Sequence, residues 1–375
     1  YFIYIDHVNK AIPEHHKLGN LEVKMSNLCS EITLPTGMDK DGKERTAVCC
    51  LCSLNLETWL EWNEEEQFIP DVMRFLDNVL QDFIDNAPDE MERARYSAMR
   101  ERSVGLGVMG LHSFYQSQNI PLESVMAKVW NKKMFKHIRE QADIASVELA
   151  HERGACPDAA DYGIMERFSS KMAVAPTASI SIICGGSSPG IEPIAANSFT
   201  HKTLSGSFSV KNKYLKKLLA EKNKDTEEVW SSITTHEGSV QHLDFLSDDE
   251  KDVFKTAFEL DQRWIIDLAG DRSAFICQSQ SINVFLPADV EKKVLHDIHW
   301  QAWKKGVKSL YYCRSKSIQR AEAVSQKEEV NEISADGIMP LPSPDAIEIP
   351  LAAATPASEG SSENDNDYEE CLACQ

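Results

Sequence analysis

The stretch Ser26–Thr36 combines polar and apolar side chains in a pattern that constrains the rest of the chain. On an extended backbone, Asn27, Cys29 and Glu31 point to the same side. An amide, a thiol and a carboxylate then lie next to one another, with apolar neighbours to pack them in place. An amide both donates and accepts hydrogen bonds and a carboxylate accepts a proton, so this group suits a substrate with hydroxyls. The alternative is a buried strand with one inert cysteine, because free cysteine often behaves as a small core residue.

Length and charge limit the class of the protein and its partners. A chain of 375 residues can form one large or two medium domains. Its net charge of −20 argues against nucleic acid as a partner, because phosphate binding needs a basic patch. No apolar run reaches the length of a membrane span and no signal peptide opens the chain, so we expect a cytoplasmic protein with no membrane contact. The ten cysteines are then expected to be reduced thiols, some of them redox-active.

Apolar periodicity predicts both helices and strands. Behind Pro70, apolar side chains recur at helical spacing as far as Phe83. Further helices are predicted over residues 89–103, 122–153, 211–223, 249–267 and 288–306, and strands over 278–286 and 307–313. Residues 1–5 are also strand-like. We expect this first strand to pair with a second polypeptide, as part of a larger structural unit.

Two glycine-rich segments are candidate phosphate sites. Residues 105–110 match the dinucleotide fingerprint as a string, but charged residues precede them where the fingerprint needs an apolar strand. Close backbone packing without a nucleotide is therefore the favoured interpretation. Residues 173–181 place small side chains at a strand-to-helix junction and lead into Gly185–Gly190. Backbone N–H groups exposed there can hold a phosphate, and a surface loop is the alternative.

The composition changes at Ala321. From there to Gln375 we count thirteen Asp and Glu against one Lys, and periodicity disappears, which predicts a disordered acidic tail. The tail ends in a CxxC formed by Cys371 and Cys374. This CxxC could be half of a zinc site, with the cysteines of residues 49–52 as the other half. A dithiol that carries electrons fits a mobile tail better.

Together these segments resemble the large, catalytic subunit of class I ribonucleotide reductase, specifically its C-terminal half, from Tyr1 to the final CxxC. The Asn27–Ile32 run resembles the active-site finger loop of that family. The resemblance implies that Cys29 becomes the thiyl radical that removes the 3′ hydrogen of the ribose. It also implies that Glu31 takes the 3′-hydroxyl proton and that Asn27 hydrogen-bonds the substrate.

The resemblance assigns roles to further residues. Cys49 aligns with one of the two cysteines that reduce the substrate and end as a disulfide. Tyr311 and Tyr312 match the tyrosine pair that relays the radical from the small subunit. Cys371 and Cys374 match the tail dithiol that re-reduces the disulfide. The substrate-binding residues that it implies are Ser26, Pro176, Thr177, Ala178 and Ser179.

The resemblance also implies a fold and partners. Residues 1–320 are expected to form the C-terminal part of a ten-stranded α/β barrel with a central finger loop, and residues 321–375 the flexible tail. The activity implied is that of a ribonucleoside-diphosphate reductase, an oxidoreductase that binds no cofactor or metal in this chain and takes its radical from a metal-containing, di-iron type small subunit. The N-terminal half of the family subunit, with the partner of Cys49 and the ATP and deoxynucleotide effector site, is not in this sequence. Either the sequence is a fragment or the subunit is split, and we expect a split subunit with that half on a separate chain. Thioredoxin or glutaredoxin is the expected reductant, and a ribonucleoside diphosphate the substrate.

Two other classes stay open at this point. A glycyl-radical enzyme also uses a finger-loop cysteine, but it needs a glycine-centred radical motif near the C-terminus and no tyrosine pair. A non-enzymatic metal-binding or scaffold protein would use the cysteine clusters to hold zinc. Stoichiometric zinc in the reduced protein would favour the scaffold.

Overall fold

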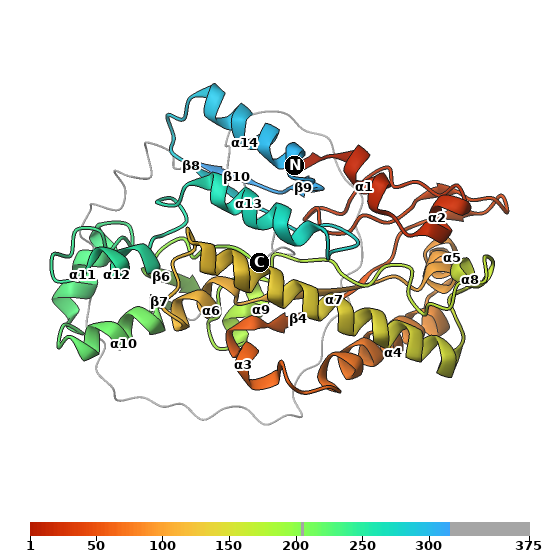
Figure 1. Cartoon of the computed structure of the whole chain (residues 1–375), viewed down its shortest axis with the longest axis horizontal. Coiled ribbons are helices and arrows are strands. Elements are labelled where there is room, and N and C mark those ends of the chain that lie inside the picture. Colours follow the sequence, from red (N-terminus) through yellow and green to blue (C-terminus); the bar gives the residue numbers. More distant parts are fainter. Residues whose placement is uncertain (204–205, 316–375) are drawn as a thin grey trace, which may run out of the picture.

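The computed structural model describes residues 1–203 and 206–315 (Figure 1). Its α-helices are α1 (Ile5–Ala11), α2 (Glu14–Leu18), α3 (Trp59–Trp62), α4 (Phe68–Asn86), α5 (Glu92–Glu101), α6 (Leu111–Ser117), α7 (Val125–Arg153), α8 (Pro157–Ala160), α9 (Ala178–Ile183), α10 (Lys213–Glu221), α11 (Glu227–Thr235), α12 (Asp248–Val253), α13 (Gln262–Ser273) and α14 (Lys292–Lys304). Its strands are β1 (Phe2–Ile3), β2 (Gly37–Met38), β3 (Glu44–Arg45), β4 (Cys50–Asn55), β5 (Val104–Met109), β6 (Ser198–Thr203), β7 (Gly206–Lys211), β8 (Val284–Leu286), β9 (Ser309–Leu310) and β10 (Cys313–Ser315). None of these described helices is long and apolar enough to cross a membrane. The domain boundary predicted at residue 320 and the tail beyond it lie outside the described residues.

A row of parallel segments forms the centre of the fold. β4 pairs in parallel with β5 along its whole length. β5 is bridged in parallel to the segment 170–174, and that segment is bridged to residues 278–286, which include β8. β8 in turn pairs in parallel with β10. Parallel strands of this kind need helical crossovers, and the chain between them is largely helical, so the architecture is the α/β fold that we predicted.

Long helices pack beside this row of strands. α4 contacts α7, and α7 contacts α13, so that the three lie side by side (Figure 1). α4 buries Met73, Leu76 and Leu80, whose spacing places them on one face of the helix. α7 begins after Ser124, whose hydroxyl accepts a main-chain N–H of the first turn, and ends at Arg153, just before Gly154. Both helices form where the apolar periodicity predicts them.

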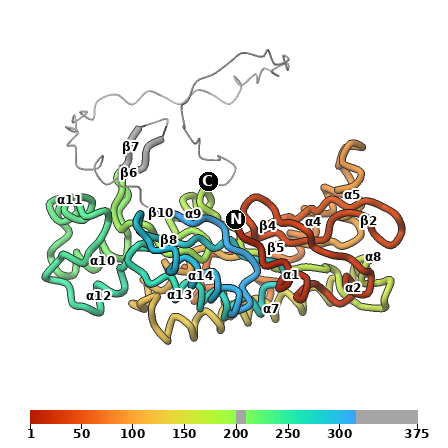
Figure 2. The backbone as a smooth tube through the Cα atoms, turned by 90° about the horizontal axis from the view of Figure 1, so that it is seen from above, coloured from red at the N-terminus to blue at the C-terminus, as the bar shows by residue number. Residues whose placement is uncertain are grey.

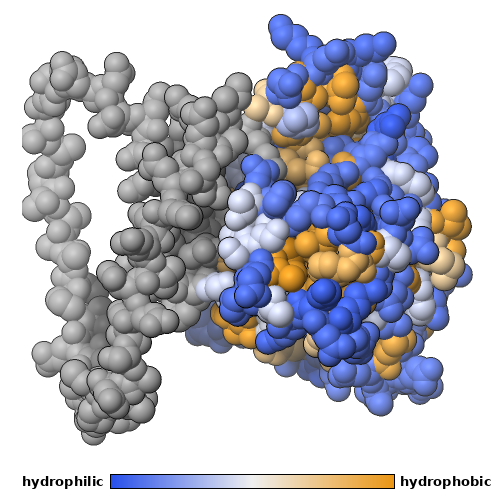
Figure 3. All heavy atoms as spheres, turned by 90° about the vertical axis from the view of Figure 1, so that its left-hand side faces the viewer, coloured by the Kyte–Doolittle hydropathy of each residue, from blue (hydrophilic) through white to orange (hydrophobic). Residues whose placement is uncertain are grey.

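A smaller lobe at one end of the molecule contains α10, α11 and α12 (Figures 1 and 2). It has its own core, which includes Leu215, Leu219, Trp230 and Ile233, all nearly inaccessible to solvent. From this side the described surface is mostly hydrophilic, with separate apolar areas (Figure 3). The lobe is therefore stabilised by a hydrophobic cluster distinct from the main core.

Several regions differ from what the sequence predicts. Of the strand expected over 278–286 only Val284–Leu286 forms, and of the strand expected over 307–313 only Ser309–Leu310 forms, with β10 beginning at Cys313. Within residues 1–5 only Phe2–Ile3 is a strand, because α1 begins at Ile5, and β1 pairs antiparallel with β9 of the same chain. The single helix expected over 249–267 is two helices, since Ser247 caps α12 with a capping box and Asp261 caps α13. The β6–β7 hairpin and α11 were not predicted.

Candidate active site

The tip of the loop that carries Cys29 is a tight turn. The main-chain N–H of Asn27 donates to the carbonyl of Ile32 at 3.3 Å, and the N–H of Ser30 donates to the carbonyl of Asn27 at 3.2 Å. Asn27 Oδ1 accepts the N–H of Ile32 at 3.0 Å, and Ser30 has a left-handed φ of 66°. The extended strand expected for Asn27, Cys29 and Glu31 is therefore wrong. The physical reason is that the asparagine side chain binds the local backbone and closes a turn.

Serines of the neighbouring segment 278–286 hold this turn in place. Ser281 Oγ donates to the carbonyl of Cys29 at 2.5 Å. The N–H of Ser279 donates to the carbonyl of Glu31 at 2.9 Å. Cys29 is 8% exposed and Glu31 is 2% exposed. The thiol and the carboxylate are thus fixed in a buried position by residues about 250 positions away in the sequence.

A row of sulfur and phenol groups leads away from the turn. Cys29 Sγ lies 3.5 Å from the hydroxyl of Tyr311. Tyr311 is 3% exposed, and its ring centroid lies 4.0 Å from that of Tyr312, which is partly exposed. The guanidinium of Arg314 lies 5.5 Å from the centre of the Tyr312 ring. The structure therefore brings together the predicted radical residues Cys29, Tyr311 and Tyr312.

The buried position of Glu31 changes the pKa of its carboxyl group. Burial raises its pKa, and hydrogen bonds from Asn27 and Ser281 partly oppose that rise. Ser281 Oγ lies 3.2 Å from Glu31 Oε2. A carboxylate with a raised pKa is a better proton acceptor at neutral pH than an ordinary one, so Glu31 can act as a general base beside Cys29.

Gln278 connects the turn to Cys49. Its Nε2 donates to Cys49 Sγ at 3.3 Å and to the carbonyl of Val104 at 3.1 Å, while its Oε1 accepts the N–H of Thr33 at 3.2 Å. Burial raises the pKa of the Cys49 thiol, and nearby carboxylates including Glu31 act in the same direction. Gln278 was not predicted as a site residue. The sequence does offer a signal for Gln278: a glutamine in a strand segment that is expected to be buried needs hydrogen-bond partners for its amide, which makes it a candidate site residue.

Glycines on β5 allow the strands to approach closely near Cys49. A Cβ atom on Gly105 would lie 2.4 Å from Leu51 Cδ2 and 3.0 Å from Cys49 Sγ. A Cβ atom on Gly107 would lie 2.5 Å from the carbonyl oxygen of Ala173. The prediction that these glycines serve close packing is confirmed.

Residues Pro176–Ser179 lie at the junction between the segment 170–174 and α9. Thr177 has a left-handed φ of 55°, and its Oγ1 accepts the N–H of Gly190 at 2.7 Å, so the two glycine- and serine-rich loops are joined. Thr177 is buried, whereas the other three residues are partly exposed. Ser26 Oγ donates to the carbonyl of Asn27 at 3.0 Å. The role of all five residues in substrate binding stays a prediction.

The other cysteines of the predicted clusters fall into two groups. Cys50 and Cys52 lie on β4 and pack against the main core. Cys371 and Cys374 lie outside the described residues. Within the described part of the chain, no group of three or more His, Cys, Asp or Glu side chains is placed to hold a metal ion.

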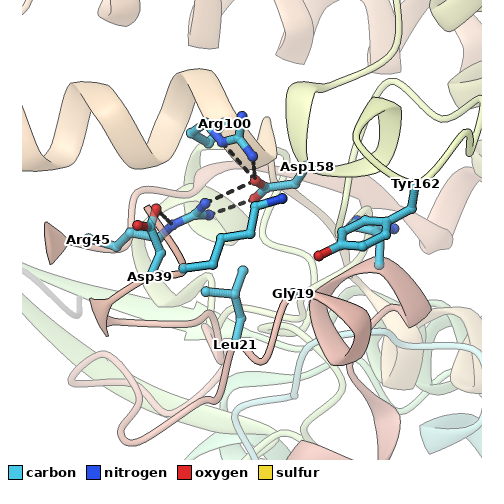
Figure 4. Close-up of a pocket in the computed structure, with 9 residues that line it drawn as sticks. Gly19, Leu21, Asp39, Arg45, Arg100, Asp158 and Tyr162 are labelled. Carbon is cyan, nitrogen blue, oxygen red and sulfur yellow. Dashed lines mark hydrogen bonds and ion pairs between the residues drawn. The ribbon is translucent and has the colours of Figure 1, made fainter. Parts of the chain in front are cut away.

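A cluster of charged side chains lies between β3, α5 and α8 (Figure 4). Asp158 accepts two hydrogen bonds from Arg45, at 2.6 and 2.9 Å, and one from Arg100 at 2.9 Å. Asp39 accepts a further bond from Arg45 at 3.1 Å. Because these buried charges are paired with one another, we interpret the cluster as structural.

Comparison with known proteins identifies relatives of this arrangement. Residues 1–162 and 158–313 match the family model described as "Ribonucleotide reductase, barrel domain". The chain is 48% identical over 314 residues to the ribonucleoside-diphosphate reductase large subunit of Invertebrate iridescent virus 6, covering 83% of this chain and 32% of the relative. It is 46% identical over 327 residues to the large subunit of Invertebrate iridescent virus 3, covering 86% and 51%. Among solved structures, the Actinobacillus ureae class Id ribonucleotide reductase alpha subunit matches with a TM-score of 0.77 and 37% identity, covering 86% of this chain and 59% of that one.

These matches identify the fold and show how much of each relative the chain covers. The barrel description and the structural neighbour confirm the predicted α/β barrel-type fold. The chain spans about a third to a half of the length of these two curated relatives. It belongs to the ribonucleotide reductase barrel-domain family.

Proposed function

We propose that this chain supplies the C-terminal part of the catalytic subunit of a ribonucleoside-diphosphate reductase, which converts ribonucleotides to 2′-deoxyribonucleotides. The observation that carries the proposal is the 3.5 Å contact between Cys29 Sγ and the Tyr311 hydroxyl. A thiol in contact with a phenol can give its hydrogen atom to the tyrosyl radical. Tyr311 then regains its hydroxyl and Cys29 becomes a thiyl radical.

The neighbouring groups fit the steps that follow. The Cys29 thiyl radical takes the 3′ hydrogen of the ribose, while Glu31 accepts the 3′-hydroxyl proton and Asn27 binds the substrate. The 2′-hydroxyl then takes up a proton from a thiol and leaves as water. The sugar radical that remains takes up two electrons, a second thiol proton and the proton held by Glu31, after which Cys29 returns the 3′ hydrogen and becomes a thiyl radical again. Cys49 and a second cysteine, carried by another part of the subunit, supply these electrons and form a disulfide. The raised pKa of the Cys49 thiol keeps it protonated and thus able to donate hydrogen.

The remaining predicted residues complete the cycle. Cys371 and Cys374 exchange with the disulfide and are themselves reduced by thioredoxin or glutaredoxin. The loop Pro176–Ser179, together with Ser26, binds the ribonucleoside diphosphate. The support for this assignment is the family motif and the loop geometry at Thr177.

The proposed enzyme needs partners that this chain does not provide. These are the part of the subunit that the relatives carry outside the matched region, with its ATP and deoxynucleotide effector site, and a radical-generating small subunit of the metal-containing, di-iron type. We place the assembly in the cytoplasm. The chain matches 32% and 51% of the length of the two viral relatives.

The test is reconstitution. The purified chain is combined with the rest of the subunit and the small subunit, and formation of deoxyribonucleotide from ribonucleoside diphosphate is measured. We expect turnover that depends on all three components, a stable complex between the two parts of the large subunit, and loss of turnover with Tyr311→Phe. Full turnover by Tyr311→Phe, or stoichiometric zinc bound to an inactive assembly, would contradict the proposal.

A further inference from the structure

Tyr311 and Tyr312 are consecutive residues whose rings pack against each other. Their ring centroids are 4.0 Å apart, with an angle of 40° between the ring planes. On a regular strand, consecutive side chains point to opposite faces of the sheet. The chain must therefore depart from regular strand geometry at the tyrosine pair. Accordingly, β9 ends at Leu310 and β10 begins only at Cys313.

The hydrogen bonds to the neighbouring segment show that this departure is one extra residue. β10 pairs with β8 so that Cys313 lies opposite Val284, and the N–H of Val284 donates to the carbonyl of Tyr312 at 2.9 Å. Two positions earlier, the same parallel pattern would join the N–H of Tyr312 to the carbonyl of Ile282. The N–H of Tyr311 occupies that carbonyl instead, at 2.7 Å. The extra residue, as in a β-bulge, thus takes away the main-chain acceptor that the Tyr312 N–H would have.

The side chain of Asn283 supplies the missing acceptor. Its Oδ1 accepts the N–H of Tyr312 at 2.9 Å, and its Nδ2 donates to Oε1 of Glu192 at 2.5 Å. Because a main-chain N–H can only donate, the amide must turn its oxygen to Tyr312 and its nitrogen to the carboxyl of Glu192. Asn283 is 3% exposed and Glu192 is 8% exposed, so water hardly competes for either bond. The two bonds together hold the main chain of Tyr312 in its irregular position.

We propose that Asn283 is a positioning residue of the radical path, whose side chain, held by Glu192, keeps the two tyrosine rings in contact. This inference rests on the proposed function. A radical on Tyr312 takes the hydroxyl hydrogen of Tyr311, so that Tyr312 regains its O–H bond and the radical moves to Tyr311. Tyr311 must at the same time reach Cys29 Sγ, which lies 3.5 Å from its hydroxyl. A regular strand would turn one of the two rings away and so meet only one of these requirements.

Asn283→Leu tests this role in the reconstituted enzyme. Leucine has a similar volume but neither accepts from Tyr312 nor donates to Glu192. We therefore expect kcat to fall about tenfold or more while KM for the nucleotide is unchanged. Hydrogen exchange at the main-chain amide of Tyr312, followed in the same assembly, should become faster, because this amide loses its acceptor.

Asn283→Asp is the conservative variant. It keeps an oxygen for the N–H of Tyr312, so we expect it to retain most of kcat and slow exchange at that amide. Burial raises the pKa of Glu192 to about 8, so at neutral pH this carboxyl is protonated and can donate to the carboxylate that the substitution introduces. Loss of turnover in Asn283→Asp equal to that in Asn283→Leu would overturn the role of the side-chain oxygen.

Asn131→Leu is the matched control. Asn131 is a buried asparagine on α7 whose Oδ1 accepts from Arg272 at 3.2 Å and whose Nδ2 donates to the carbonyl of Leu268 at 2.9 Å. The same chemical change there should lower stability and leave kcat normal. Normal kcat in Asn283→Leu, with loss of turnover in Tyr312→Phe, would overturn the role of Asn283 alone. Full turnover by Tyr312→Phe would overturn the proposed function as well.

Discussion

The Cys29 thiol lies 3.5 Å from the hydroxyl of Tyr311, although 282 positions separate the two residues in the sequence. The contact joins the tip of a tight turn to the strand region around β9 and β10. Both groups are buried, so water is largely kept from the space where a hydrogen atom would move. Direct contact of this kind favours a short-range transfer, because the reacting atoms are already positioned.

Cys29→Ser should abolish turnover in the reconstituted enzyme. A serine O–H bond is stronger than a thiol S–H bond, so a tyrosyl radical cannot oxidise it. We expect a loss on the order of 10³-fold or more, both with thioredoxin and with dithiothreitol as reductant. Cys184→Ser, which alters an exposed cysteine, is the control and should retain turnover. Substantial activity of Cys29→Ser would show that the radical does not pass through this sulfur.

Glu31→Gln should lower turnover and change its pH dependence. Because burial raises the pKa of Glu31, the base becomes protonated at a higher pH than an ordinary carboxyl. The value of kcat/KM should therefore fall as the pH decreases through this raised pKa. Glu31→Gln removes the ionising group, so we expect kcat/KM to fall about 100-fold. The decrease of kcat/KM at low pH that is due to Glu31 should also disappear. Identical pH–rate profiles for the two proteins would contradict the role of Glu31 as base.

The double substitution Cys371→Ser and Cys374→Ser should separate the two ways of reducing the active-site disulfide. With thioredoxin as reductant we expect turnover to stop after the first cycle, since the carrier dithiol is gone. With dithiothreitol, a small molecule that reaches the disulfide directly, turnover should continue. Product formation is measured in parallel with each reductant. Equal loss under both conditions would contradict the carrier role of the tail.

The sequence was sufficient to single out chemical groups that the structure places together. Cys29, Glu31 and the tyrosine pair were recognisable by motif, and the structure brings Cys29 into contact with Tyr311. Close packing at Gly107 was also predictable, because the fingerprint lacked its apolar strand. The 2.5 Å separation between a Cβ atom there and the carbonyl of Ala173 explains why glycine is required.

The geometry around these groups could not be predicted from local sequence. The turn at Ser30 depends on hydrogen bonds that Asn27 makes across it, and on Ser281, which is distant in sequence. Gln278 contacts Cys49 only because strands from different parts of the chain are neighbours. Tyr1 lies against Tyr311 and Tyr312 because β1 pairs with β9, and no local sequence pattern predicts that pairing. In each case a long-range contact overrides or supplements local preference.

Glu101 provides a test of the buried charges that support the fold. It is fully buried, Ser103 Oγ donates to its Oε2 at 2.8 Å, and its Oε1 has no hydrogen-bond partner among the described residues. Burial raises the pKa of Glu101 to about 7. Below about pH 4.5, the pKa of Glu101 in the unfolded state, Glu101 is protonated in both the folded and the unfolded protein. Its ionisation then does not change the free energy of unfolding. As the pH rises towards 7, the folded state holds a proton that the unfolded state has released, so the free energy of unfolding falls by about 3 kcal/mol.

Glu101→Gln should remove this loss. We expect the variant to be more stable than the parent chain at pH 8 by up to about 3 kcal/mol and close to it at pH 4.5, measured by urea unfolding at both pH values. Asp158→Asn is the opposite control. Its pKa lies well below the usual range because Arg45 and Arg100 hold the carboxylate, so its stabilising effect is present at neutral pH and is lost as the pH falls. Asp158→Asn should therefore destabilise the chain by about 3 kcal/mol at pH 7 and by less in acid. Parallel pH dependence of all three proteins would show that neither carboxyl is linked to folding.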